Sequence, residues 1–271
     1  MQQPIAVLDS GVGGLTVVKE VMRQLPREKI LYFGDTARTP YGPRGAEEVV
    51  AFTREIVDYL IRYNPKMIVI ACNTATAAAL EDIRGRVALP VIGVISPGAR
   101  AAVSRTATGV VGVIGTEGTI NSGAYDAALK RLCPDIEVIS RACPSFVPLV
   151  EDGNFHSMET LLTVVEALLP LNRSPMDCLI LGCTHYPFLA ECISLAMGPD
   201  VALINSAEET ARDIRAVLEE NGKLEGEDGA APVHRFVCSG DPQKFLEIAQ
   251  AWLGEPVLVT SALGPIPDMK I

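Results

Sequence analysis

The sequence predicts an α/β fold built from two similar parallel-sheet domains. Short runs rich in Val, Ile and Leu alternate with amphipathic stretches along the chain, which is typical of buried parallel strands joined by helices. A pattern of apolar strand, small residue, cysteine and polar residue also occurs twice. The length is compatible, because 271 residues with 48% hydrophobic content suffice for one or two domains.

Each apolar run is short and ends at turn residues, so each is predicted to be a strand. The predicted strands cover 5–9, 29–35, 67–72, 90–95, 109–115, 136–140, 178–183, 201–206 and 234–240, with a last short strand near residue 259. Helices fill the intervals between them. The stretch "EEVVAFTREIVDYLIRY" over 47–63 is predicted to bury one face, made of Val50, Ile56, Val57, Leu60 and Ile61.

The repeat relates two long segments of the chain. "MIVIACNTATAAALEDI" over 67–83 matches "CLILGCTHYPFLAECI" over 178–193, and the earlier segments place Ser10 opposite Thr116. A repeat of about 100 residues is too long for a solenoid. It predicts two flavodoxin-like domains related by a pseudo-twofold, with the active site in the cleft between them.

The domain boundaries follow from the repeat. Residues 98–207 are expected to form the second domain, and residues 1–97 together with 208–271 the first. The C-terminal part is assigned to the first domain because its last helix and tail have no counterpart between the halves. Within it, "NGKLEGEDGAAP" over 221–232 is rich in Gly and charge and is expected to be a mobile loop.

Composition excludes several classes of function. The formal charge of -10 and the absence of a basic cluster argue against nucleic acid as a primary partner. No signal peptide or membrane span is visible, so a cytoplasmic protein is expected. The seven cysteines include no CxxC pair, so reduced thiols are expected. No metal is expected, since Cys183 and His185 give two ligands with no second pair at useful spacing.

Polar residues gather where the predicted strands end, which is where ligands bind in α/β sheets. They are Asp9, Ser10, Asp35, Cys72, Asn73, Thr74, Thr116, Thr119, Cys183, Thr184 and His185. The exposed amides of a helix start are expected to lower the pKa of each cysteine thiol and, with the Asn and Thr side chains, to accept a carboxylate. Two opposed thiols suit the inversion of a carbon centre without a cofactor, since one removes a proton and the other returns one.

Asp9 and His185 are expected to assist by exchanging protons with the neighbouring thiols. The segment "DSGVGGLT" also imitates a dinucleotide fingerprint, with Asp35 about 20 residues further on. However, Thr16 stands where the third glycine belongs. The alternative is a tight strand-to-helix turn that needs the backbone freedom of glycine.

Six motifs carry a resemblance to a known family. "LDSGVGGLTVV", "YFGDTARTPYG", "ACNTAT", "PSFVPLVEDG", "LGCTHYP" and "SGDP" occur in the order and spacing found in bacterial glutamate racemases of the aspartate/glutamate racemase superfamily, which the chain resembles over nearly its whole length. The resemblance implies interconversion of L- and D-glutamate by two cysteines without a cofactor, D-glutamate being used for peptidoglycan, and a homodimer. Some members carry an N-terminal extension linked to activation by a cell-wall precursor. Here the first predicted strand begins at Ile5, so that regulation is not expected.

The resemblance also implies roles for single residues. Cys72 and Cys183 match the two catalytic acid/bases, Cys72 acting on D-glutamate and Cys183 on L-glutamate. Asp9, Asp35, Glu151 and His185 match supporting acid/base or electrostatic groups. The matched substrate contacts are Asp9, Ser10, Tyr41, Gly42, Asn73, Thr74, Thr116, Thr119, Thr184 and His185.

Three alternatives remain open at this point. The first is a racemase of aspartate or another small acid, which would differ in what surrounds the distal carboxylate near Ser10, Tyr41 and Gly42. The second is a nucleotide-binding oxidoreductase, and titration with NAD would test it. The third is a non-catalytic two-domain acid-binding protein, in which both cysteines should be replaceable.

Overall fold

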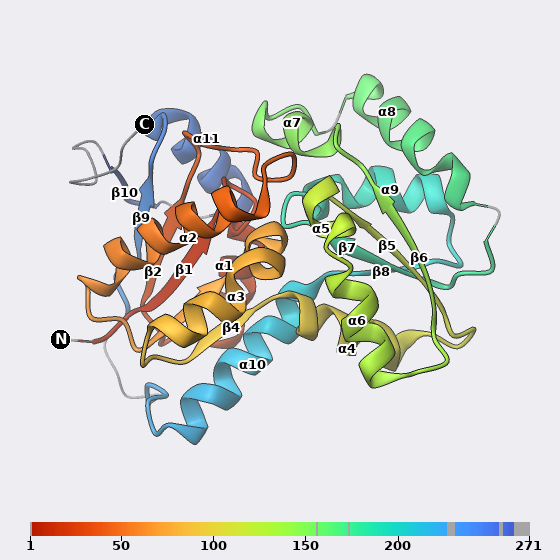
Figure 1. Cartoon of the computed structure of the whole chain (residues 1–271). Helices are drawn as coiled ribbons and strands as arrows, with labels where there is room; N and C mark the ends of the chain where they lie inside the picture. Colours follow the sequence, from red (N-terminus) through yellow and green to blue (C-terminus); the bar gives the residue numbers. More distant parts are fainter. Residues whose placement is uncertain (1, 156, 173, 227–230, 255–256, 263–271) are drawn as a thin grey trace.

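Every apolar run predicted to be a strand is one in the computed structural model, which describes residues 2–155, 157–172, 174–226, 231–254 and 257–262 (Figure 1). Residues 5–9 and 67–70, for example, are completely buried, as expected of strands covered on both faces. The strands are β1 (Ile5–Asp9), β2 (Ile30–Gly34), β3 (Met67–Ile70), β4 (Val91–Gly93), β5 (Val110–Gly115), β6 (Glu137–Ala142), β7 (Cys178–Gly182), β8 (Ala202–Ile204), β9 (Arg235–Cys238) and β10 (Val259–Ser261).

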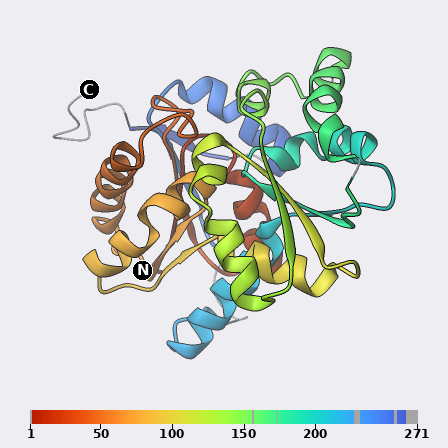
Figure 2. The ribbon, with the colours of Figure 1, turned by 45° about the vertical axis from the view of Figure 1, so that its right-hand side comes forward.

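The strands form two parallel sheets that share one internal order. The first sheet runs β10-β9-β2-β1-β3-β4 and the second runs β6-β5-β7-β8. In each half the first strand therefore lies between the second and the third, and the fourth lies outside the third. Figures 1 and 2 show the two sheets as separate halves of the molecule. The predicted α/β fold with two similar parallel sheets is confirmed.

Helices cover the sheets between these strands. They are α1 (Leu15–Gln24), α2 (Ala46–Ile61), α3 (Asn73–Arg86), α4 (Ile95–Arg105), α5 (Glu117–Asn121), α6 (Ala124–Leu132), α7 (Phe146–Glu151), α8 (Met158–Leu168), α9 (Ala190–Met197), α10 (Ser206–Glu220) and α11 (Pro242–Leu253), with short 3-10 turns η1 (Leu169–Leu171) and η2 (Tyr186–Leu189). Alternate residues of one strand enter different cores. In β1, Ile5 and Val7 face the core shared with α1, and Ala6 and Leu8 face the core shared with α2.

The buried face of α2 differs from the predicted one. Ile56, Val57 and Leu60 are buried as expected, but Val50 is only half-buried and Ile61 is exposed. Val49 is buried instead, together with Thr53, whose hydroxyl donates to the Val49 carbonyl at 2.7 Å. The buried face therefore includes Val49 and Thr53 in place of Val50 and Ile61. Thr53 can face the core because its hydroxyl bonds its own helix and leaves no polar group unpaired.

The C-terminal part of the chain returns to the first half. Strand β9 pairs with β2, and β10 pairs with β9. Helix α10 packs against both α1 and α4, so it lies between the two halves. Helix α11 also reaches the second half, where Trp252 stacks on Phe188 with ring centroids 4.0 Å apart. The predicted loop over 221–232 lies partly outside the described residues.

A buried ion pair fastens the start of that return to the first sheet. Lys66 Nζ lies 2.6 Å from Glu28 Oε2, and the two side chains are 2% and 1% exposed. Lys66 Nζ also donates to the Lys223 carbonyl at 2.8 Å, and Glu28 Oε1 accepts from the Glu225 amide at 2.9 Å. The pair therefore ties three segments together that are far apart in sequence. Within the described ranges, no helix is both long and apolar enough to span a membrane.

Candidate active site

The two cysteines of the repeat meet at one buried cavity. Cys72 follows β3 and Cys183 follows β7, so each half delivers one thiol from the end of its third strand. The cavity is lined by Ser10, Pro40, Tyr41, Gly42, Cys72, Asn73, Thr74, Thr116, Val147, Cys183, Thr184 and His185. It encloses about 10 Å³, which is room for no more than about one water molecule. The walls must therefore move apart for a larger ligand to enter.

Cys72 caps helix α3. Its Sγ accepts from the Ala75 amide at 3.4 Å and lies 3.6 Å from Ser10 Oγ. Burial and the nearby charge of Asp9 nevertheless raise the pKa of Cys72 to about 12. The expectation of a lowered pKa is therefore wrong for this thiol, because desolvation of the thiolate outweighs the amide bond. Cys72 therefore keeps its proton as a neutral thiol near neutral pH.

Cys183 has a different setting. No α-helix begins at this cysteine; a 3-10 turn follows from Tyr186, and α9 begins only at Ala190. Its Sγ lies 3.7 Å from Nδ1 of His185. The other ring nitrogen of that histidine, Nε2, lies 2.6 Å from Glu151 Oε1. Thiol, imidazole and carboxylate thus form a chain, and the histidine can exchange a proton with the thiol.

The His185–Glu151 pair carries opposite pKa shifts. Burial lowers the pKa of His185, but its bonds to Cys183 and Glu151 outweigh burial and raise this pKa well above the ordinary value. Burial raises the pKa of Glu151, but the bond to His185 and its charge lower it overall. Glu151 also accepts from the Val12 amide at 3.1 Å. The pair is therefore an imidazolium and a carboxylate near neutral pH.

This pair predicts a pH window for stability. The contribution of His185 to the free energy of unfolding is complete below its ordinary pKa of 6.5, and it is lost as the pH rises through the pKa that His185 has in the folded protein. The contribution of Glu151 to the free energy of unfolding is complete above its ordinary pKa of 4.5, and it is lost as the pH falls through the pKa that Glu151 has in the folded protein. The difference in Tm between the wild type and Glu151→Gln should therefore be largest between pH 4.5 and 6.5. A difference that does not change with pH would contradict this assignment.

Asp9 joins the two halves beneath the cavity. It is completely buried, and its oxygens accept from the Gly11 amide and from Thr184 Oγ1 of the second half, both at 3.0 Å. Burial raises its pKa despite the opposing charge of His185. A buried carboxylate with a raised pKa is suited to exchange protons with a neighbouring thiol.

Hydroxyl and amide groups also line the cavity. Thr74 Oγ1 lies 2.9 Å from Thr116 Oγ1 and 3.3 Å from Thr119 Oγ1, so this cluster also joins the halves. Asn73 is 2% exposed, and its Oδ1 accepts from the Tyr125 hydroxyl at 2.7 Å. Its Nδ2 has no hydrogen-bond partner among the described residues. A buried donor without a partner is a natural contact for a substrate carboxylate.

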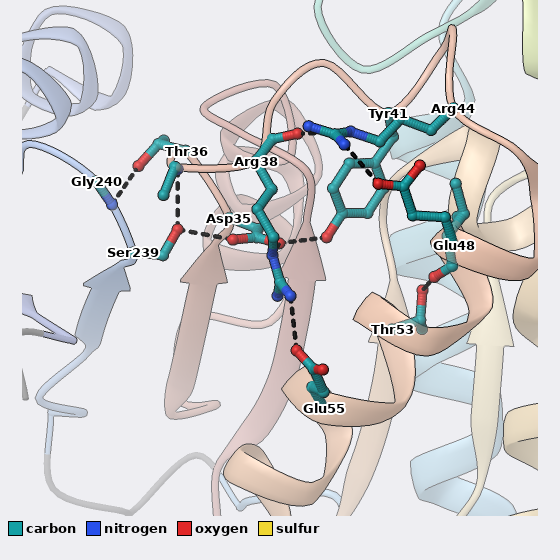
Figure 3. A network of polar contacts seen from close by, with 12 residues as sticks. Asp35, Thr36, Arg38, Tyr41, Arg44, Glu48, Thr53, Glu55, Ser239 and Gly240 are labelled. Carbon is teal, nitrogen blue, oxygen red and sulfur yellow. Dashed lines mark hydrogen bonds and ion pairs between the residues drawn. The ribbon is translucent and has the colours of Figure 1, made fainter. Parts of the chain in front are cut away.

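Asp35 bonds to three side chains of the first half. Its carboxylate accepts from the Tyr41 hydroxyl, from Arg38 Nε at 2.7 Å and from Ser239 Oγ at 2.7 Å (Figure 3). Asp35 does not line the cavity, whereas Tyr41 does. The structure thus connects Asp35 to the cavity through Tyr41.

The glycines of "DSGVGGLT" make room for the second half. A Cβ at Gly11 would overlap the Glu151 carboxylate, and one at Gly13 would overlap Thr184 and His185. Neither glycine has a positive φ, so close approach, rather than backbone freedom, explains them. The amides of Gly11 and Val12 bond to Asp9 and Glu151. A dinucleotide would bind its pyrophosphate at the amides of this turn, but those amides are already bonded to carboxylates. The interpretation of this segment as a dinucleotide fingerprint is therefore not supported.

The structure brings together most of the predicted site. Both cysteines and eight predicted substrate contacts line the cavity, while Asp9, Thr119 and Glu151 each bond to a residue that lines it. Pro40 and Val147 also line it, and Tyr125 orients Asn73, although none of the three was predicted. Pro40 and Val147 lie in motifs that carried the resemblance, so these motifs were the available signal. Tyr125 had no comparable signal.

One thiol from each of two like halves, facing the same cavity, defines a class of enzyme. It is the arrangement of a two-base racemase or epimerase, in which a proton leaves one face of a carbon and another arrives at the opposite face.

Comparisons with known proteins identify the family. The model of the Asp/Glu/Hydantoin racemase family matches residues 5–214, and the chain belongs to this family. A glutamate racemase of Oceanobacillus iheyensis is 54% identical over 251 residues, which cover 92% of this chain and 91% of that protein. A crystal structure of a glutamate racemase isoform from Bacillus anthracis has a TM-score of 0.93 at 47% identity, covering 97% of this chain and 98% of that one. A glutamate racemase from Francisella tularensis, crystallised with D-glutamate, has a TM-score of 0.89 at 36% identity and covers 98% of both chains.

Proposed function

We propose that this protein interconverts L- and D-glutamate by direct proton transfer between the substrate and two thiols. The observation that carries the proposal is the meeting of Cys72 and Cys183 at one cavity. Glutamate is favoured as the substrate because relatives about half identical over more than nine tenths of the chain are glutamate racemases. The protein would then act in the cytoplasm and supply D-glutamate for peptidoglycan.

The two thiol settings suggest how each direction runs. From L-glutamate, Cys183 takes the α-proton as a thiolate, while Cys72 must be a thiol to return one to the other face. The pKa of about 12 keeps Cys72 in that form. From D-glutamate the roles are exchanged. The charge of Asp9 acts on Cys72, which supports Asp9 as the group that then takes the Cys72 proton.

The remaining groups serve the substrate carboxylates. The unpartnered Nδ2 of Asn73 is a donor on the cavity wall, and the Thr74 hydroxyl lines the same cavity. The Thr184 hydroxyl also lines it, but donates to Asp9 and so can only accept from a ligand. Donors held in position stabilise negative charge that develops next to the α-carbon when the proton leaves. The domain division at residues 97/98 and 207/208 is part of the proposal, because it assigns one thiol to each domain.

Proton exchange with solvent tests the function. Protein freed of metal by a chelator and checked for the absence of pyridoxal absorbance is incubated with L-glutamate in deuterated water, and optical rotation and α-deuterium are followed. We expect loss of rotation together with deuterium at the α-carbon. A parallel incubation with L-aspartate separates the two substrates. If neither L-glutamate nor L-aspartate exchanges its α-proton, the racemase proposal is refuted.

We further propose a homodimer that uses exposed apolar side chains of the second half. Met158, Leu162 and Leu169, on α8 and the turn that follows it, are 70%, 56% and 61% exposed, and Leu195 on the neighbouring α9 is 72% exposed. Exposed apolar groups on adjoining helices mark an interaction surface, and a second copy presents the same groups.

Sedimentation at several concentrations tests the dimer. Leu162→Glu should shift the protein to the monomer, because the charge would be desolvated at the interface. Val233→Glu is the matched control, since Val233 is 69% exposed but belongs to the first half. A Leu162→Glu protein that remains dimeric would exclude this surface.

A further inference from the structure

The "SGDP" segment, residues 239–242, holds the loop that follows β2. Ser239 Oγ donates to Asp35 Oδ1 at 2.7 Å and accepts from the Ala37 amide at 3.0 Å. The Gly240 amide donates to Thr36 Oγ1 at 2.9 Å. Figure 3 shows these contacts running from the end of β9 to the loop. The C-terminal return of the chain therefore contacts the segment that leads to the cavity.

Asp35 lies at the centre of this network and is completely buried. One of its oxygens receives the Ser239 hydroxyl, and the other receives Arg38 Nε and the Tyr41 hydroxyl. Arg38 is itself held by Glu55, whose Oε2 lies 2.6 Å from Arg38 Nη1. The carboxylate is thus fixed by three donors and does not line the cavity that holds the thiols. Its geometry suits positioning rather than proton transfer to substrate.

Tyr41 carries the effect of this network to the cavity. Its side chain is 1% exposed, and its hydroxyl is bonded to Asp35. Tyr41 and Gly42 both line the cavity. On the far side, the Gly42 carbonyl accepts from the Gly118 amide of the second half at 2.9 Å. The backbone at residues 41–42 is therefore held between the Asp35 network and the second half.

We propose that Ser239 is a positioning residue for the substrate: acting through Asp35 and Tyr41, it fixes the Tyr41–Gly42 backbone that forms one wall of the cavity. The inference rests on the proposed function, since it concerns how glutamate is bound. Loss of the Ser239 hydroxyl leaves one Asp35 oxygen without its side-chain donor. The carboxylate can then rotate, and the Tyr41 anchor loosens. Binding is affected more than proton transfer, because neither thiol takes part in the network.

Steady-state kinetics of Ser239→Ala test the inference. We expect KM for glutamate to rise about tenfold with kcat nearly unchanged, the pattern of an interaction made equally in ground and transition states. Ser239→Thr retains a hydroxyl and should restore KM. Asp241→Ala is the matched control in the same segment: Asp241 caps α11 through the Gln243 amide at 2.8 Å, so this change should lower Tm and leave KM unchanged.

A double-mutant cycle tests the connection through Asp35. Tyr41→Phe breaks the other end of the network, so its effect on KM and that of Ser239→Ala should not multiply in the double variant. A folded Ser239→Ala protein with unchanged KM, or effects that multiply independently, would overturn the inference. If Ser239→Ala does not fold, Ser239→Cys, which keeps a side chain at this place but donates only weakly to Asp35, must raise KM, and an unchanged KM overturns the inference. Lack of activity in the wild type would instead refute the proposed function.

Discussion

Replacing either Cys72 or Cys183 with alanine is expected to abolish racemisation, with a loss of about 10²- to 10⁴-fold or more in kcat/KM in both directions. In the proposed mechanism each thiol acts on only one face of the α-carbon, and the two come from different halves of the molecule. Optical rotation of L- and of D-glutamate measures the loss. Cys192→Ala is the matched control, because Cys192 is also buried but lies outside the cavity.

The exchange of α-deuterium sharpens this test. A single remaining thiol can still remove a proton from one enantiomer and return a deuteron to the same face, which gives exchange without inversion. We expect residual exchange to be confined to L-glutamate in Cys72→Ala and to D-glutamate in Cys183→Ala. Exchange of the same enantiomer in both variants, or full racemisation in either, would contradict the two-thiol mechanism.

Lys66→Met is expected to lower the free energy of unfolding by about 3–5 kcal/mol, the usual cost of removing one partner from a buried ion pair. Glu28 would remain 1% exposed with its charge uncompensated, and the Lys223 carbonyl would lose its donor. Urea denaturation followed by circular dichroism measures the change. The double variant Lys66→Met/Glu28→Leu should recover part of the loss, because no buried charge remains unpaired, while the Lys223 carbonyl and the Glu225 amide still lack their partners.

A surface pair provides the comparison for Lys66. Arg86 and Asp58 lie 2.8 Å apart but are 45% and 48% exposed. Because water screens exposed charges, Arg86→Met should cost no more than about 1 kcal/mol. Equal losses for Lys66→Met and Arg86→Met would mean that the buried pair contributes no more than an ordinary surface contact.

The strands and the thiol pair could be predicted from sequence because each depends on a local signal. A buried parallel strand such as 178–182 must be a continuous apolar run. Cys183 is the residue that follows this run, so its position at the end of the strand can be predicted from the sequence alone. The match with 67–72 then implies a shared cavity. Both halves share one strand order, so equivalent strand ends lie at the same place in each half.

Features that depend on several segments could not be predicted. The pKa of Cys72 depends on burial by the whole cavity and on Asp9, not on its helix start alone. The place of Asp35 depends on Ser239, which lies about 200 residues away in sequence. The face of α2 depends on Thr53 bonding to its own helix. In each case the deciding neighbour is distant in sequence, or a hydroxyl that hydropathy treats as polar.

The two halves share a strand order, and the proposed reaction has an equal symmetry, because its substrate and product are mirror images. L- and D-glutamate are mirror images with equal free energies in water, so the equilibrium constant of their interconversion is one. The Haldane relation then requires kcat/KM to be the same in both directions, however different the surroundings of Cys72 and Cys183 are. The helix cap at one thiol and the histidine at the other can therefore change kcat and KM separately, but only in compensating amounts. Although its two halves differ around the thiols, such an enzyme must have the same kcat/KM for both enantiomers.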